Sequence, residues 1–204
     1  MNAAKACLFA GVLLVPVFFA NAQNATLHPD RDAFICDCQG NANNPGGPLT
    51  KLYQGPYYTG GHQCYARTVL HWALTGLPQT GNILSATLQM KCTARYGTLT
   101  GRMAFYRIVE DWGATTVTYN SMPRHTSQDS ILADWPAVNQ WLSVDVTQLV
   151  RFFVAHPDSN FGIYGHSANT AGGTGAVELN SSRFSDSLGW PVLAIQFEPN
   201  GVRM

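Results

Sequence analysis

Charged side chains are scarce in this sequence of 204 residues, and they form no cluster of one sign. They make up 12% of the chain, and only Lys51 and Lys91 are lysines after residue 22. A nucleic-acid partner needs clustered Lys and Arg to neutralise phosphates, so no nucleic-acid partner is expected. The surface is instead rich in Thr, Ser, Asn and Gly. Such a surface favours neutral hydrogen bonds, for which sugars are natural ligands.

After residue 22, the chain also lacks an apolar run long enough to cross a bilayer. Its first 22 residues contain a positive Lys5, an apolar run over residues 6–20 and small residues at 20–22. This is the three-part pattern of a secretory signal peptide. We therefore predict a signal peptide over residues 1–22 and a single domain over residues 23–204. The protein is expected to be secreted and extracellular, with no membrane partner.

Catalytic signatures are missing as well. The chain has no Gly-x-Ser-x-Gly elbow, no His-Glu-x-x-His pair and no phosphate-binding Gly-rich motif before a helix. Glu110 and Asp111 are adjacent, and consecutive strand residues point to opposite faces, so they cannot flank one glycosidic bond. Asp111 and Asp145 are interpreted as structural residues. We predict that the protein is not an enzyme and uses no cofactor.

Four cysteines remain after residue 22, and an even number in a secreted protein favours disulfides. If Cys36 and Cys38 lie on one strand, their side chains share a face and a bond between them would be strained. Each is therefore expected to pair with Cys64 or Cys92, and we favour Cys38 with Cys64 and Cys36 with Cys92. The alternative is a metal site made by Cys36, Cys38, Cys64 and His62. We predict disulfides and no metal.

The hydrophobic pattern predicts many short strands and one helix. Alternation is clearest over residues 83–93, where one face is apolar and the other polar. Further strands are predicted over residues 34–38, 65–74, 101–109, 115–119, 141–146, 161–166, 177–180 and 192–197. A helix should begin at Asp145 or Thr147 and end at Ala155, and loops should occupy residues 40–48, 54–61 and 167–175. The predicted fold is an all-β, antiparallel two-sheet β-sandwich of jelly-roll type with one short helix.

Seven short motifs occur in a fixed order in the chain. They are Gly76-Leu77-Pro78, Ser85-Ala86-Thr87-Leu88, Asp111-Trp112, Val117-Thr118-Tyr119, Val144-Asp145-Val146-Thr147, Asn160-Phe161-Gly162-Ile163 and Pro191-Val192-Leu193. Their order resembles the DNRLRE domain, also counted as the ninety-sixth family of carbohydrate-binding modules. The resemblance implies a secreted, non-catalytic module that binds an extracellular polysaccharide. The six residues that name the domain do not occur as a string, and the cysteines are local additions.

Aromatic residues are the best candidates for ligand binding. Sugar rings stack on flat aromatic faces, while their hydroxyls take hydrogen bonds from polar side chains. Tyr53, Tyr57 and Tyr58 flank a Gly-Pro pair in the predicted loop 54–61 and are predicted to bind the ligand. His62 and His166, in Gly-rich segments, could contact the same ligand. The expected partner is a polysaccharide, with uronic-acid polymers among those to test.

A second function class stays open at this point. A chain that consists almost entirely of one module, with Asn- and Gly-rich segments, is also suited to be a structural subunit of an extracellular filament or surface matrix. Such a subunit would self-associate, for example by adding a strand to its neighbour. A polysaccharide lyase or hydrolase ranks last, because the chain offers no placed acid and base.

Overall fold

The computed structural model describes residues 22–38, 42–46, 49–77, 82–128, 130–168 and 171–198. The predicted signal peptide lies outside this part of the chain, except for its last residue, Ala22. Within the described residues, no helix has the length and apolar character needed to span a bilayer. The signal peptide and secretion therefore stay predictions.

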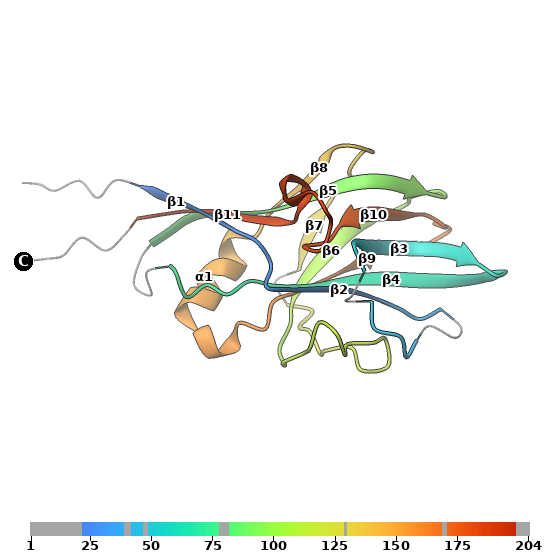
Figure 1. Ribbon diagram of the computed structural model, residues 1–204, viewed down its shortest axis with the longest axis horizontal. Helices are drawn as coiled ribbons and strands as arrows, with labels where there is room; N and C mark the ends of the chain where they lie inside the picture. Colours follow the sequence, from blue (N-terminus) through green and yellow to red (C-terminus); the bar gives the residue numbers. More distant parts are fainter. Residues whose placement is uncertain are drawn as a thin grey trace, which may run out of the picture.

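Eleven β-strands, one α-helix and two short 3-10 helices form from the described residues (Figure 1). In chain order they are β1 (Gln23–Leu27), β2 (Arg31–Cys36), β3 (Lys51–Thr59), β4 (His62–His71), β5 (Asn82–Tyr96), β6 (Arg102–Arg107), β7 (Ile131–Ala133), β8 (Trp141–Asp145), α1 (Thr147–Ala155), η1 (Pro157–Ser159), β9 (Ile163–Ala168), β10 (Ala176–Asn180), η2 (Ser187–Gly189) and β11 (Val192–Glu198). The predicted all-β class with one short helix is confirmed.

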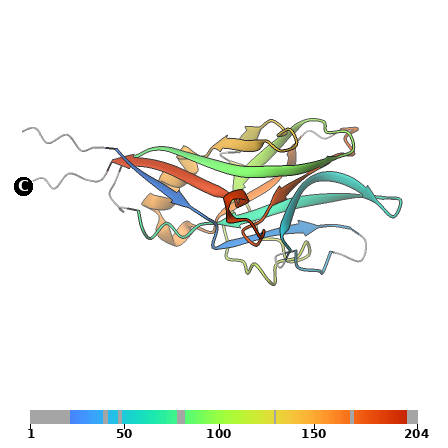
Figure 2. The same ribbon diagram turned by 45° about the horizontal axis from the view of Figure 1, so that its top comes forward.

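The strands form one hydrogen-bonded antiparallel sheet that curls into a half-barrel (Figure 2). Its path runs β1-β11-β5-β10-β3-β4-β9-β6-β7, with β2 paired to β4 and β8 paired to β5. Strand β10 joins the two halves of the curl, because it pairs with β5 and also with β3. The predicted two-sheet jelly roll is not confirmed, since these hydrogen bonds link all the strands into a single sheet.

Helix α1 closes one end of the half-barrel and begins where the sequence places it. The Asp145 carboxylate accepts hydrogen bonds from the backbone N–H of Thr147 at 2.9 Å and from its hydroxyl at 2.5 Å. Asp145 is thus a structural residue, as predicted. Leu149, Val150 and Phe153 are buried in the main core at helical spacing. The apolar face of the helix therefore fixes it against the sheet.

The predicted loop 54–61 is wrong, because this segment forms most of β3 and the turn that follows. Gly60 and Gly61 both have positive φ, 57° and 81°, and they connect Thr59 directly to its partner His62. A two-residue turn with two positive φ values matches the right-handed twist of a hairpin. The glycines thus mark the tip of a β-hairpin and not an irregular loop.

The predicted strand 115–119 is also wrong. The backbone N–H of Val117 donates a hydrogen bond to the Gly113 carbonyl at 2.9 Å, which closes a turn. The Thr118 and Ser121 hydroxyls bond to each other at 2.9 Å and to each other's backbone N–H groups. Such local side-chain bonds compete with strand pairing. The β-branched composition of the segment therefore does not decide its conformation.

The Asp-Trp pair of the sequence motif is structural, as predicted. The Arg31 guanidinium donates a hydrogen bond to the Asp111 carboxylate at 2.8 Å. The Trp112 indole is buried and donates to the Phe161 carbonyl at 2.8 Å. Both contacts fasten the long segment after β6 to the sheet.

Candidate functional site

An aromatic cleft lies where β3 and β5 end and β10 begins. These strand ends are at the end of the molecule opposite α1 (Figures 1 and 2). Its volume is about 560 Å³, within the range of about 300–1,000 Å³ typical of ligand pockets. The residues that line it are Phe34, Tyr53, Tyr57, Tyr58, Tyr96, Gly97, Thr174 and Ala176. The structure therefore brings the three predicted tyrosines together and adds a fourth.

The cleft is located where β3 changes its partner strand. Residues 51–54 pair with β10, whereas residues 55–59 pair with β4. At the change, Gly55 has a φ of 125°, and a Cβ atom there would lie 2.6 Å from the Gly175 carbonyl oxygen. Only glycine fits this close approach without strain. Near this change of partner strand, Tyr53 of β3 lies against Phe34 of β2, with their ring centroids 5.1 Å apart.

Tyr58 and Tyr96 present the most exposed rings of the aromatic cleft. Their side chains are 59% and 45% exposed, whereas Tyr53 and Tyr57 are half-buried. The Tyr53 and Tyr96 ring centroids lie 6.5 Å apart. Exposed aromatic faces can stack on the C–H faces of a sugar ring, and the phenol groups can hydrogen-bond its hydroxyls. The arrangement suits a flat, polar-edged ligand.

Glu178 supports two of these rings from β10. It accepts hydrogen bonds from the phenols of Tyr53 at 3.1 Å and Tyr96 at 2.8 Å and from the Thr93 hydroxyl at 2.7 Å, and it pairs with Lys51 at 3.1 Å. Burial alone would raise the pKa of Glu178, but these partners outweigh burial and lower the pKa below 4.5. Burial, and then Glu178, raises the pKa of Tyr53 to about 12. The tyrosines are therefore neutral donors at physiological pH.

We expect Glu178→Gln to lower the free energy of unfolding at neutral pH by about 1–3 kcal/mol, because hydrogen bonds to a charged acceptor are lost. The folded-state pKa of Glu178 is depressed, so its contribution is present above pH 4.5 and is lost as pH falls through the folded-state value. Urea unfolding of both proteins from neutral pH to about pH 2 measures this. The two stabilities should converge in acid; a constant difference at every pH would contradict the assignment.

Three of the cysteines lie together beside the aromatic cleft. Their pairing differs from the one that the sequence analysis favours. Cys36 is bonded to Cys38, with their Cα atoms 5.4 Å apart, while Cys64 and Cys92 are free thiols. The expected pairs of Cys38 with Cys64 and Cys36 with Cys92 are wrong. Strand β2 ends at Cys36, so Cys38 lies beyond the strand and its side chain can turn toward Cys36. Cys92 is buried in the main core, apart from the other three.

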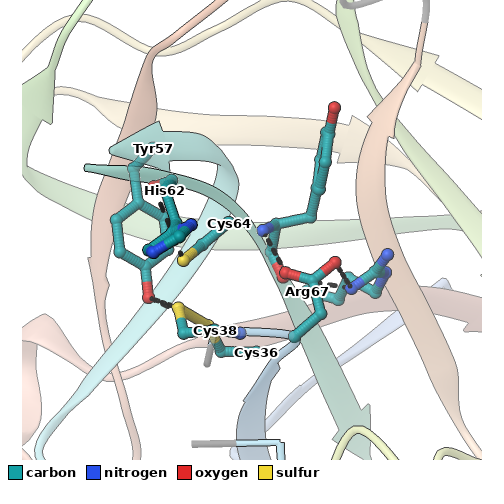
Figure 3. The surroundings of a disulfide bond; sticks show 8 residues. Cys36, Cys38, Tyr57, His62, Cys64 and Arg67 are labelled. Carbon is teal, nitrogen blue, oxygen red and sulfur yellow. Dashed lines mark hydrogen bonds and ion pairs between the residues drawn. A yellow bond between two sulfur atoms is a disulfide. The ribbon is translucent and has the colours of Figure 1, made fainter. Parts of the chain in front are cut away.

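Tyr57 connects this disulfide to the aromatic cleft (Figure 3). Its hydroxyl lies 3.0 Å from the Cys36 sulfur and 2.7 Å from the Cys38 sulfur, and its backbone pairs with Cys64 across the hairpin. Burial, followed by the nearby Cys64 and Asp37, raises the pKa of Tyr57 to about 12. Tyr57 is thus a fixed wall of the cleft more than a free stacking surface.

A comparison with models of protein families matches residues 23–196 to carbohydrate-binding module family 96. This chain belongs to carbohydrate-binding module family 96. The match confirms the resemblance drawn from the seven sequence motifs. A comparison with curated proteins finds no match. Membership of family 96 suggests that the module binds carbohydrate.

Neither predicted histidine of the family 96 module is among the described residues that line the aromatic cleft. His62 is exposed at the tip of the β3–β4 hairpin. His166 is half-buried on β9, where its ring stacks on Tyr106 with a centroid distance of 5.1 Å. Burial lowers the pKa of His166. His166 pairs with Ala104 of β6, whereas His62 pairs with Thr59 of β3, and a contact of both histidines with one ligand stays a prediction.

Tyr96 and Glu178 are the residues of this site that the sequence analysis missed. Tyr96 lies at the end of the long strand β5, just before Gly97. Glu178 lies between the apolar residues Val177 and Leu179 on β10. A single charge among the apolar residues of a strand indicates a side chain that reaches a polar partner or solvent, and this signal could have identified Glu178. Nothing in the sequence indicates that β5 and β10 bring the two residues to Tyr53.

Proposed function

We propose that the family 96 chain is a secreted, non-catalytic carbohydrate-binding module that recognises an extracellular polysaccharide in the aromatic cleft. The proposal rests on one observation above all, the convergence of four tyrosines from two strands on a cleft of about 560 Å³. Tyr58 and Tyr96 stack on sugar rings. Tyr53 and Tyr57 form the more buried part of the cleft, where Glu178 holds the Tyr53 phenol and the disulfide sulfurs contact the Tyr57 hydroxyl.

The state of Glu178 supports binding over catalysis. A glycosidase needs a carboxylic acid with a raised pKa and a second carboxylate, about 5–9.5 Å apart, on either side of the bond to be cleaved. The pKa of Glu178 is lowered, and its carboxylate already accepts hydrogen bonds from Tyr53, Tyr96 and Thr93. This carboxylate orients the aromatic rings and has no proton to give at neutral pH.

The ligand class follows from the chemistry of the cleft. Its neutral phenols and aromatic faces suit pyranose rings. Lys51, which pairs with Glu178 at 3.1 Å, places one positive charge near the tyrosines. Uronic-acid polymers are therefore the first polysaccharides to test, with neutral polymers as the comparison.

Native affinity electrophoresis tests the proposal. The purified chain migrates through gels that contain alginate, another uronic-acid polymer, xylan, a soluble cellulose or a soluble chitin derivative, each with calcium and with a chelator. We expect at least one polymer to retard the chain relative to a reference protein of similar mass. Free migration in every gel would overturn the proposal and would favour the structural-subunit alternative.

A further inference from the structure

Three buried sulfur atoms form a compact cluster beside the aromatic cleft (Figure 3). The side chains of Cys36, Cys38 and Cys64 are 5%, 2% and 1% exposed, and their sulfur atoms all lie within 4.8 Å of one another. We call Cys36, Cys38 and Cys64 the sulfur cluster. Two of these sulfurs share a disulfide, which leaves Cys64 as a free thiol next to it.

Strand pairing holds the sulfur cluster in place from both sides. Cys36 ends β2 opposite Ala66 of β4, and Cys64 lies two residues earlier on the same strand. Because side chains alternate along a strand, His62 and Cys64 project from the same face of β4. The Cys64 sulfur lies 4.0 Å from the backbone carbonyl oxygen of His62 (Figure 3). The reduced cluster would therefore offer three sulfurs, and the exposed His62 imidazole on the same strand face can turn toward them. Thiolates and imidazole are preferred ligands of Zn²⁺ and similar ions.

The carboxylate of Asp37, between Cys36 and Cys38 in the sequence, already has two partners. Asp37 accepts a hydrogen bond from the Tyr65 backbone N–H at 2.5 Å and lies 3.6 Å from the Arg67 guanidinium. Oxygen ligands of this kind favour Ca²⁺ and Mg²⁺, whereas thiolates favour thiophilic ions. The donor set at this place is thus sulfur and nitrogen.

We infer that the reduced sulfur cluster, with His62 as the fourth ligand, is a binding site for one thiophilic d10 cation of the Zn²⁺ and Cd²⁺ class. Zinc–sulfur bonds of about 2.3 Å in a tetrahedral site place sulfurs about 3.8 Å apart. The bonded sulfurs of Cys36 and Cys38 move apart on reduction, and the Cys64 sulfur, within 4.8 Å of both, needs to close by at most about 1 Å. Site and cleft share Tyr57, but the metal site does not depend on the proposed function.

Metal loading begins with reduction of the Cys36–Cys38 disulfide. A water-soluble phosphine and one water molecule convert the Cys36–Cys38 bond into two thiols and leave a phosphine oxide. The cation then displaces the protons of the three cysteine thiols and keeps its own oxidation state. The oxidised chain, in which Cys36 and Cys38 have no free thiols, cannot hold the ion in this way.

Cadmium titration tests the site. Every sample carries Cys7→Ser, which removes the cysteine that precedes residue 22. The phosphine reduces the chain and is then removed under anaerobic conditions. Cd²⁺ is added in steps while the ultraviolet absorption of the thiolate-to-cadmium charge transfer is recorded. We expect saturation at one Cd²⁺ per chain and loss of the band when excess Zn²⁺ competes. Cys64→Ser should abolish this stoichiometric band. The matched control Cys92→Ser, which removes a buried thiol elsewhere, should leave it unchanged.

Circular dichroism of each reduced variant shows whether it has folded, and Cys38→Ser provides a second removal of one sulfur if Cys64→Ser does not fold. The change His62→Ala should keep the band but weaken Cd²⁺ binding at least about tenfold, a loss of one ligand. The proposal is overturned if the reduced chain shows no saturable band, or if Cys92→Ser removes the band as fully as Cys64→Ser. Unchanged affinity in His62→Ala would overturn the four-ligand site.

Discussion

Replacing Tyr58 or Tyr96 with alanine is expected to weaken polysaccharide binding by about thirtyfold in each case, which corresponds to about 2 kcal/mol. These rings are the exposed aromatic surfaces of the cleft, at 59% and 45% exposure. Aromatic anchors at the centre of an interface carry most of the binding free energy, so truncation of either ring removes a stacking surface. Affinity electrophoresis over a range of polymer concentrations gives the dissociation constant of each variant.

Two controls separate stacking from other effects. Tyr96→Phe keeps the ring and loses only the hydroxyl that donates to Glu178, so it should retain most of the affinity that Tyr96→Ala loses. Trp141→Ala removes another exposed aromatic side chain, 39% exposed on β8 and outside the cleft, and should bind like the unchanged chain. Equal losses in Trp141→Ala and Tyr58→Ala would remove the cleft from the binding site.

The elements that the sequence predicted correctly are those with a signal in their own residues. Alternation predicted β5 because this strand has one buried apolar face. The helix was predicted because Asp145 and the apolar residues that follow carry a start signal and a helical period. The single curled sheet could not be predicted, because it depends on the pairing of β10 with both β3 and β5, which are far apart in sequence.

The candidate site, like the fold, was predicted only where the signal was local. Tyr53, Tyr57 and Tyr58 were predicted as binding residues from their residue type. They were placed on a loop because Gly55 and Pro56 resemble turn residues. In the structure these two residues lie within β3, where Gly55 allows the strand to change partners. The Cys36–Cys38 bond was rejected on the assumption that β2 continues through Cys38. A strand end two residues earlier reverses that conclusion.

Asp32→Ala is expected to lower the free energy of unfolding by about 3 kcal/mol, because removal of one partner leaves the rest of a buried polar network without its hydrogen bonds. Asp32 is fully buried on β2, where its carboxylate pairs with Arg183 and accepts a hydrogen bond from the Ser182 backbone N–H at 2.5 Å. Arg183 also donates to the Asp32 carbonyl at 2.9 Å. These bonds fasten the segment after β10 to a strand 150 residues earlier in the chain.

The neighbouring residue on the same strand supplies a matched control for this effect. Arg31 pairs with Asp111 at 2.8 Å, but the Asp111 side chain is 74% exposed. An exposed ion pair contributes less than about 1 kcal/mol, so Asp111→Ala should change the urea midpoint only slightly. Burial raises the pKa of Asp32, which shows that its charge is itself costly to bury. The loss in Asp32→Ala therefore arises from the unpaired Arg183 and Ser182 groups, and similar losses in the two variants would contradict this explanation.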